Sequence, residues 1–195
     1  MRPSLATKPR LLGIAGSLRK ASYSRAILVA LAATVDSKAV LAIFPLNDIP
    51  VYDQDADTIT PPASVAALRS EIGAADGIII ASPEYNAGMS GVMKNALDWA
   101  SRPYGKSVLT GKPVLTLTSS PASTGGARAQ AQLNETLTAI AARLVLRPQA
   151  TIGAVHEKMV DGKFADVKSL VFLNAAVDDL LRDIKHKASV TRQES

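Results

Sequence analysis

A strand, a loop and a helix follow one another without spare residues in positions 11–28, which read LLGIAGSLRKASYSRAIL. Short apolar runs and helical patterns alternate in the same way along the rest of the chain. Strands are predicted at 10–15, 39–44, 77–81 and 114–118, with a fifth inside 144–152, where Pro148 interrupts it. Helices are predicted at 22–35, 63–74 and 92–101, from the end of the 119–126 loop to about 142, and at 167–184. This alternation is typical of an α/β fold, a doubly wound parallel sheet with helices on both faces.

The turn after the first strand excludes two common types of nucleotide-binding sheet. A Rossmann sheet needs G-x-G-x-x-G here and an acidic residue near the end of the second strand. The chain instead has Gly13-x-x-Gly16, and its second strand ends in Phe-Pro. A Walker loop needs Gly-Lys where Leu18 and Arg19 stand. We therefore expect a flavodoxin-like, five-stranded parallel sheet in the order 2-1-3-4-5. Residues 1–195 are predicted to form this single domain, with flexible segments at 1–9 and 186–195.

The loop at 16–24 has the composition of a phosphate site. It combines a glycine with three serines, Arg19 and Lys20, and no acidic residue precedes Asp36 in the chain. The helix that follows directs unpaired N–H groups and the positive end of its dipole into the loop. Hydroxyls and a guanidinium in the same place favour the binding of one phosphate group. An ordinary turn with solvated charges is the alternative interpretation.

Two further loops are expected beside the first, because the carboxyl ends of parallel strands meet at one edge of the sheet. Residues 82–88, SPEYNAG, offer a proline-braced backbone and a side-chain amide, and residues 119–126, SSPASTGG, offer hydroxyls and exposed N–H groups. Each loop alone is compatible with a simple turn or a helix start. Three polar, small-residue loops at one edge together indicate a site for a flat ring that carries a phosphate at its far end.

Composition excludes several other classes of function. The chain has no cysteine, so disulfides, thiolate nucleophiles and cysteine-bound metals are excluded, and redox chemistry would need a bound cofactor. No metal site is predicted. The net charge is +5, but no basic run is interleaved with the few aromatic residues, so nucleic-acid binding is not expected.

No membrane segment is expected either. The longest apolar run, at 26–35, is far shorter than the roughly 20 residues of a membrane-spanning helix. The apolar stretch near the N-terminus is too short for a signal peptide and leads directly into Arg19 and Lys20. A cytoplasmic location is therefore the default expectation.

Three segments give the chain a resemblance to a known family: GSLRKASYSRAIL, DIPVYDQD at 48–55, and SPEYNAGMSGVMKNALDW at 82–99. The match continues through GKPVLTLTSSPASTGGARAQ and covers about 10–184. These segments resemble the NADPH-dependent FMN reductase family, in the branch that includes quinone, chromate and azo-dye reductases. The chain departs from the family pattern G-S-x-R-x-x-S-x-N at one position, where Ser24 replaces the asparagine.

The resemblance implies a bound FMN, with NADPH or NADH as co-substrate. It implies that the FMN phosphate is bound by Ser17, Arg19, Ser22 and Ser24. The edge of the ring would lie against Pro83, Glu84, Tyr85 and Asn86, and its other side against Ser119, Ser120 and Gly125. It also implies a homodimer or homotetramer in which the partner subunit helps to wall the pocket.

A reaction carried by the flavin needs no catalytic side chain. A hydride from the reduced nicotinamide would pass through FMN to a small acceptor such as a quinone, a free flavin, an azo compound or chromate. Tyr85 and Met89 are expected to border the face where substrates bind. Glu84 is expected to contribute its backbone N–H rather than to act as a general base, and both histidines, His156 and His186, lie outside the three loops.

Two other functions fit the same fold. A flavodoxin-like electron carrier or another non-catalytic FMN-binding protein would bind the flavin without turnover, although such carriers are usually acidic and this chain is basic. A flavin-free regulatory or scaffold protein would not take up FMN at all. Oxidation of a nicotinamide donor separates the enzyme from the carrier, and uptake of FMN separates both from the scaffold.

Overall fold

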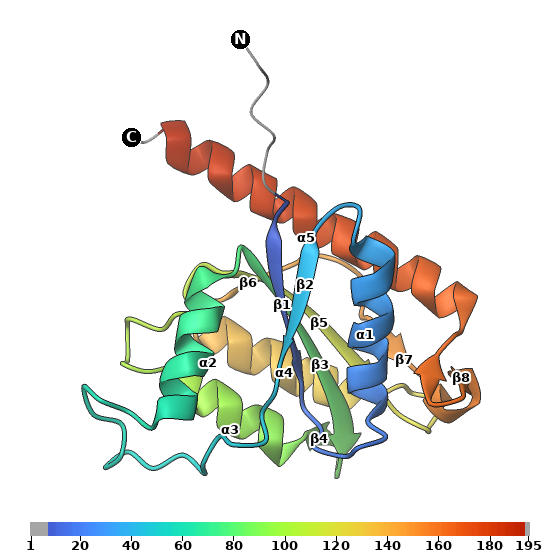
Figure 1. Cartoon of the computed structure of the whole chain (residues 1–195), viewed down its shortest axis with the longest axis horizontal. Helices are drawn as coiled ribbons and strands as arrows, with labels where there is room; N and C mark the ends of the chain where they lie inside the picture. The colour runs from blue at the N-terminus through green and yellow to red at the C-terminus, as the bar shows by residue number, and fades with distance from the viewer. Residues whose placement is uncertain (1–7, 194–195) are drawn as a thin grey trace.

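The computed structural model describes residues 8–193, so the expectations for 1–7 and 194–195 lie outside the described residues. A central sheet lies between two layers of helices, and its main strands run in the same direction (Figure 1). The main strands are β1 (Arg10–Ala15), β2 (Val40–Phe44), β3 (Gly77–Tyr85), β5 (Pro113–Ser119) and β6 (Arg143–Leu144). They pair in the order β2-β1-β3-β5-β6, all parallel. This order confirms the predicted flavodoxin-like arrangement.

The fifth strand is present as two short pieces. β6 pairs with the start of β5, and β7 (Thr151–Ile152) pairs with its end, opposite Thr118 and Ser119. Pro148 lies between the pieces and has no N–H to contribute to a ladder. The interruption predicted at Pro148 is therefore confirmed.

The helices cover the two faces of the sheet unequally. They are α1 (Tyr23–Val35), α2 (Ala63–Ala74), α3 (Gly91–Ala100), α4 (Ala127–Ala139) and α5 (Val167–Gln193), with a short 3-10 turn at Val155–Lys158. Apolar side chains of α1 and α5 form one core with one face of the sheet, and those of α2, α3 and α4 form a second core with the other face. The burial of β1, β3 and β5 between these two cores explains their continuous apolar sequences.

Helix α5 is longer than predicted. The sequence pattern placed its end near 184, but the helix continues to Gln193, and its last turns project beyond the sheet (Figure 1). Residues 185–193, KHKASVTRQ, contain neither glycine nor proline, so no helix-breaking residue ends the helix where its apolar stripe ends. No helix within residues 8–193 combines the length and the apolar character that crossing a membrane requires.

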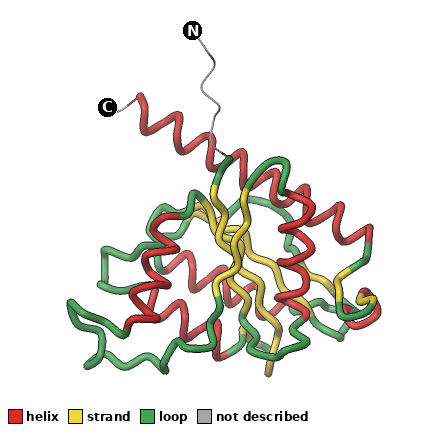
Figure 2. The backbone as a smooth tube through the Cα atoms, in the orientation of Figure 1, coloured by secondary structure: helices red, strands yellow, loops and turns green. Residues whose placement is uncertain are grey.

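The segment predicted as a loop at 82–88 is a β-hairpin instead. Strand β3 continues to Tyr85, and the chain folds back as β4 (Gly88–Met89), with Tyr85 opposite Gly88 and Glu84 opposite Met89. Asn86 and Ala87 form the two-residue turn with φ of 49° and 63°. Positive φ at both positions is typical of a type I′ turn, whose twist matches that of the strands. The hairpin extends β3 past the edge of the sheet, among the loops at the bottom of Figure 2.

A second hairpin lies beside α1. Its strands are β8 (Met159–Val160) and β9 (Lys163–Phe164), and its turn is Asp161-Gly162, with φ of 49° and 74°. Phe164 packs into the same core as α1 and α5. The hairpin is thereby held against the outer side of α1.

Candidate functional site

A crevice of about 110 Å³ lies where the adjacent strands β1, β3 and β5 end. It is lined from the first loop by Ser17, Arg19, Tyr23 and Ser24, from the hairpin by Pro83, Glu84 and Tyr85, and from the third loop by Ser119 and Pro121. The sheet order thus brings together three segments that are distant in the sequence. Seven of the eleven residues predicted to bind the cofactor line this one crevice.

The first loop is fixed against the end of β3 and the start of α3. The Gly16 N–H donates to the Ala81 carbonyl at 2.8 Å, and the Ser90 hydroxyl donates to the Gly16 carbonyl at 2.6 Å. A Cβ on Gly16 would lie 2.8 Å from the Ser90 Oγ and 3.0 Å from the Met93 Cβ. Only glycine allows the chain to pass this close to α3, so Gly16 sets the path of the loop.

Ser22 and Ser24 have different roles in the structure. The Ser22 Oγ accepts a hydrogen bond from the Arg25 N–H at 3.2 Å and is the N-cap of α1. It is not among the residues that line the crevice. The Ser24 side chain lines the crevice, and its Oγ is buried without a hydrogen-bond partner among the described residues. Ser22 therefore positions the helix, whereas Ser24 has a hydroxyl available for a ligand.

Ser119 repeats this feature on the opposite wall. Its Oγ is also buried, lines the crevice and has no hydrogen-bond partner among residues 8–193. Buried polar atoms in folded proteins are nearly always hydrogen-bonded, so each exception needs an explanation. A polar ligand held between Ser24 and Ser119 explains both. The two orphaned hydroxyls fit the phosphate and the polar groups of a nucleotide such as FMN.

Arg19 supplies positive charge beside these hydroxyls. Its side chain is exposed, and its guanidinium lies 5.7 Å from the centre of the Tyr23 ring. Within the described part of the chain it has no ion pair with a carboxylate. An uncompensated guanidinium at the N-terminal end of α1 adds to the helix dipole and favours a bound anion.

Glu84 is engaged by the protein rather than free to act as a base. Its Oε2 accepts hydrogen bonds from the backbone N–H groups of Arg128 and Ala129, both at 3.1 Å. These are orphan donors at the start of α4, where the N-cap residue Gly126 has no side chain to offer. The sequence pattern indicated a backbone role for Glu84 and carried no signal that its carboxylate caps a helix.

The remaining predicted residues lie outside the lining of the crevice. Asn86 is exposed in the hairpin turn, and the Ser120 Oγ accepts from the Ala122 N–H at 3.1 Å. Gly125 is buried with φ of 63°, where a Cβ would lie 2.8 Å from backbone nitrogens of 152 and 153. Gly125 therefore allows a close approach of two chain segments rather than a ligand contact.

Tyr85 and Met89, expected to border the substrate face, are placed differently. Tyr85 lines the crevice and is 52% exposed, as a residue at its mouth should be. Met89 is only 7% exposed and packs into the core formed with α2, α3 and α4. Because its side chain is buried, Met89 offers little surface to a substrate, which corrects the expectation.

Two residues that line the crevice were not among the sequence predictions. Tyr23 follows the cap residue of α1, and Pro121 lies inside the predicted third loop. The sequence carried a signal for Tyr23, because it stands between two serines that were predicted. Nothing in its residue type indicated that its ring would lie beneath the Arg19 guanidinium.

The 48–55 segment, part of the family resemblance, lies against α3 and not in the crevice. The Trp99 Nε1 and the Asn95 amide both donate to the Pro50 carbonyl at 2.8 Å, and the Asn95 Oδ1 accepts from the Tyr52 N–H at 2.7 Å. These bonds fix the long connection after β2. The role visible for this segment is structural.

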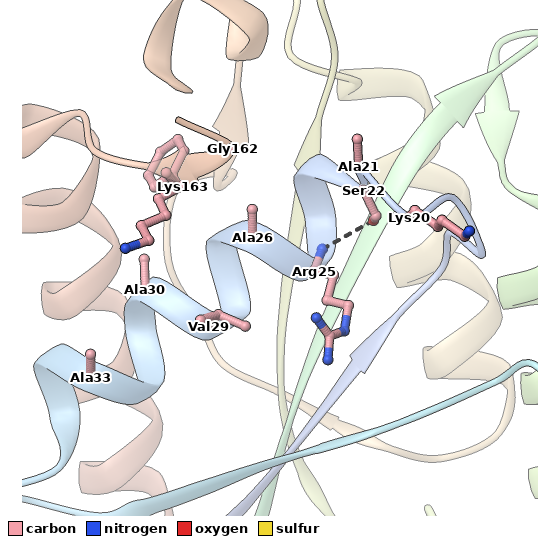
Figure 3. A pocket seen from close by; sticks show the side chains of 11 residues that line it. Lys20, Ala21, Ser22, Arg25, Ala26, Val29, Ala30, Ala33, Gly162 and Lys163 are labelled. Carbon is pink, nitrogen blue, oxygen red and sulfur yellow. Dashed lines mark hydrogen bonds between the residues drawn. The ribbon is translucent and has the colours of Figure 1, made fainter. Parts of the chain in front are cut away.

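A second hollow, of about 330 Å³, lies on the outer side of α1 against the β8–β9 turn (Figure 3). Its floor is formed by small or apolar side chains of α1, including Ala30 and Val29. Lys20, Arg25 and Lys163 stand around it, and none of them has an ion pair within residues 8–193. These charges add to the positive potential near the first loop.

Comparison with known proteins gives a consistent result. The sequence profile of NADPH-dependent FMN reductases matches residues 9–157. A quinone reductase of Pseudomonas putida is 33% identical over 177 residues, which are 91% of this chain and 95% of that protein. An NAD(P)H-dependent FMN reductase of Pseudomonas aeruginosa is 36% identical over 161 residues, 82% of this chain and 86% of the relative. Among solved structures, the flavoenzyme NAD(P)H:acceptor oxidoreductase FerB of Paracoccus denitrificans superposes with a TM-score of 0.80 at 32% identity, covering 91% of this chain and 98% of its own.

Proposed function

Because the chain belongs to the NADPH-dependent FMN reductase family, we propose that it is an FMN-dependent NAD(P)H oxidoreductase that reduces quinones and similar small acceptors. The observation that carries the proposal is the crevice at the ends of β1, β3 and β5, with its two orphaned hydroxyls and its uncompensated arginine. Quinones are the proposed acceptor class because relatives with that named activity match over most of the chain.

The phosphate of FMN is proposed to bind at the start of α1. The hydroxyls of Ser17 and Ser24 and the Arg19 guanidinium line this end of the crevice. The N-terminal N–H groups of α1 add donors and the positive end of a dipole. The departure from the family pattern at Ser24 is compatible with this assignment, because a serine hydroxyl can donate to a phosphate oxygen.

The flavin ring is proposed to extend from there between the two other walls, Pro83–Tyr85 and Ser119–Pro121. The crevice of about 110 Å³ is smaller than the roughly 300 Å³ at which cofactor pockets usually begin, so most of the ring would project beyond this subunit. A second subunit covering the ring would complete the site. This supports the proposal of a homodimer or homotetramer.

Bound FMN would supply the redox chemistry, accepting a hydride from NADPH or NADH and passing reducing equivalents to the acceptor. The residues of the chain bind, orient and exclude water. The Arg19 guanidinium would balance the phosphate charge, and the backbone of Pro83–Tyr85 would hold the edge of the ring. No proton transfer is assigned to Glu84, because its carboxylate already accepts two backbone hydrogen bonds.

The test is an anaerobic spectrum of the purified protein loaded with FMN. Addition of NADPH should remove the yellow absorbance, and subsequent addition of 1,4-benzoquinone should restore it over many cycles. Bound flavin that neither NADPH nor NADH reduces would indicate the electron carrier instead. A protein that takes up no added FMN would contradict both functions and leave the flavin-free scaffold.

A further inference from the structure

The hairpin β3–β4 and helix α4 are joined by hydrogen bonds in both directions. From the hairpin, the Glu84 carboxylate accepts from the first-turn N–H groups of Arg128 and Ala129 at 3.1 Å. From the helix, the Gln132 Oε1 accepts from the Met89 N–H at 2.8 Å. Each element therefore satisfies backbone donors of the other.

These bonds begin where the sheet ends. The parallel pairing of β3 with β5 stops at Pro83 opposite Ser119. The segments that follow Pro83 and Ser119 form two walls of the crevice. Within residues 8–193, β3 and β5 do not pair beyond Pro83 and Ser119. The Glu84 and Gln132 side chains bridge the hairpin and α4 just past this point.

Two glycines leave room for the bridging side chains. A Cβ on Gly126 would lie 3.3 Å from the Glu84 Cβ, and a Cβ on Gly88 would lie 2.7 Å from the Gln132 Oε1. The Glu84 side chain thus packs directly on the backbone of Gly126, and the Gln132 side chain packs directly on the backbone of Gly88. The close packing restricts how far the hairpin can move relative to α4.

We propose that Glu84 and Gln132 are positioning residues that hold the hairpin wall of the flavin site at a fixed distance from α4, the helix that follows the Ser119–Pro121 wall, and thereby set the affinity of the site for FMN. The inference rests on the proposed function, because it takes the crevice to be the flavin site. Glu84 acts through its Oε2, which accepts from the α4 N–H groups. Gln132 acts through Met89 and the short strand β4.

The experiment measures the FMN dissociation constant by quenching of FMN fluorescence at 25 °C. Gln132→Ala, which removes one hydrogen bond, should raise it about five- to tenfold. Glu84→Ala, which removes two, should raise it by at least as much. Glu84→Gln should stay within about twofold of the wild type, because its amide oxygen still accepts from the same N–H groups. The matched control is Glu135→Gln, which changes an exposed carboxylate of α4 that makes no hydrogen bond or ion pair among the described residues.

Glu84→Gln removes the charge of the side chain but keeps an oxygen that accepts hydrogen bonds. Wild-type FMN affinity in this variant would therefore show that the hydrogen bonds, and not the charge, are responsible. Circular dichroism and a thermal melt of each apoprotein confirm that the comparison is between folded proteins, and Gln132→Ala carries the test alone if Glu84→Ala does not fold. Wild-type affinity in both alanine variants, or equal losses in Glu84→Ala and Glu84→Gln, would overturn the inference. Failure of the wild type to bind FMN would instead overturn the proposed function.

Discussion

Replacement of Arg19 by alanine tests the phosphate assignment with little risk to the fold. The side chain is exposed, its guanidinium lies over the Tyr23 ring at 5.7 Å, and it has no ion pair within the described residues. Its removal therefore breaks no internal salt bridge. We expect the free energy of unfolding of the apoprotein to change by no more than about 0.5 kcal/mol.

The loss of FMN affinity should be much larger. A hydrogen bond between charged groups contributes about 1.5–3 kcal/mol. Its loss corresponds to a roughly ten- to 150-fold increase in the FMN dissociation constant. The increase should shrink at high salt, because the guanidinium is exposed and its charge is screened. Fluorescence titration of FMN at two salt concentrations measures both effects.

Lys20→Ala is the matched control. It removes the same charge one residue further along the chain, but Lys20 is not among the residues that line the crevice. We expect it to raise the dissociation constant by less than about threefold, through the long-range potential alone. An unchanged affinity in Arg19→Ala, or equal losses in the two variants, would refute the assigned contact.

Three further outcomes follow from the structure. Ser24→Ala should raise the FMN dissociation constant about fivefold without lowering apoprotein stability, because it removes a buried hydroxyl that has no hydrogen-bond partner among residues 8–193. Ser22→Ala should instead lower the free energy of unfolding in urea by about 1 kcal/mol, because it removes the cap of α1. Gly125→Ala should destabilise the fold by about 2 kcal/mol or more in the same assay, because its φ is 63° and the new Cβ would meet backbone nitrogens at 2.8 Å. The pKa of Asp166 is lowered, chiefly by hydrogen bonds from the Ser169 side chain and backbone. The ionised carboxylate therefore stabilises the fold above about pH 4, and this contribution is lost as the pH falls through the lowered pKa. In Asp166→Asn the loss of stability between pH 6 and pH 3 should be smaller than in the wild type, and an equal loss would contradict this.

The strands and their order could be predicted because the buried runs are continuous and apolar. Ile78, Ile79 and Ile80 are fully buried, so this stretch identifies a central strand without further context. The hairpin that follows could not be recognised in the same way. Pro83 and Asn86 are typical of loops, and the strand pairing past Pro83 depends on a type I′ turn and on contacts with α4.

The grouping of residues at the proposed phosphate end of the crevice was also accessible from sequence. Ser17, Arg19 and Ser24 lie within eight residues at the start of a helix, so local chemistry alone brings them together. The roles of Glu84 and Gln132 depend on a helix that starts more than forty positions after Glu84. Periodicity gives no information on such a pairing. It also gave no indication that Met89 is buried, because the neighbouring residues in the sequence are mostly polar or small.

The most direct test is a crystal structure of the protein grown with excess FMN. We expect a phosphate within about 2.7–3.2 Å of the Ser17 and Ser24 hydroxyls and the Arg19 guanidinium. We also expect the flavin ring to lie between Tyr85 and Pro121. Density for FMN in the second hollow, between α1 and the β8–β9 turn, or a crevice left empty at saturating FMN, would contradict the proposed flavin site.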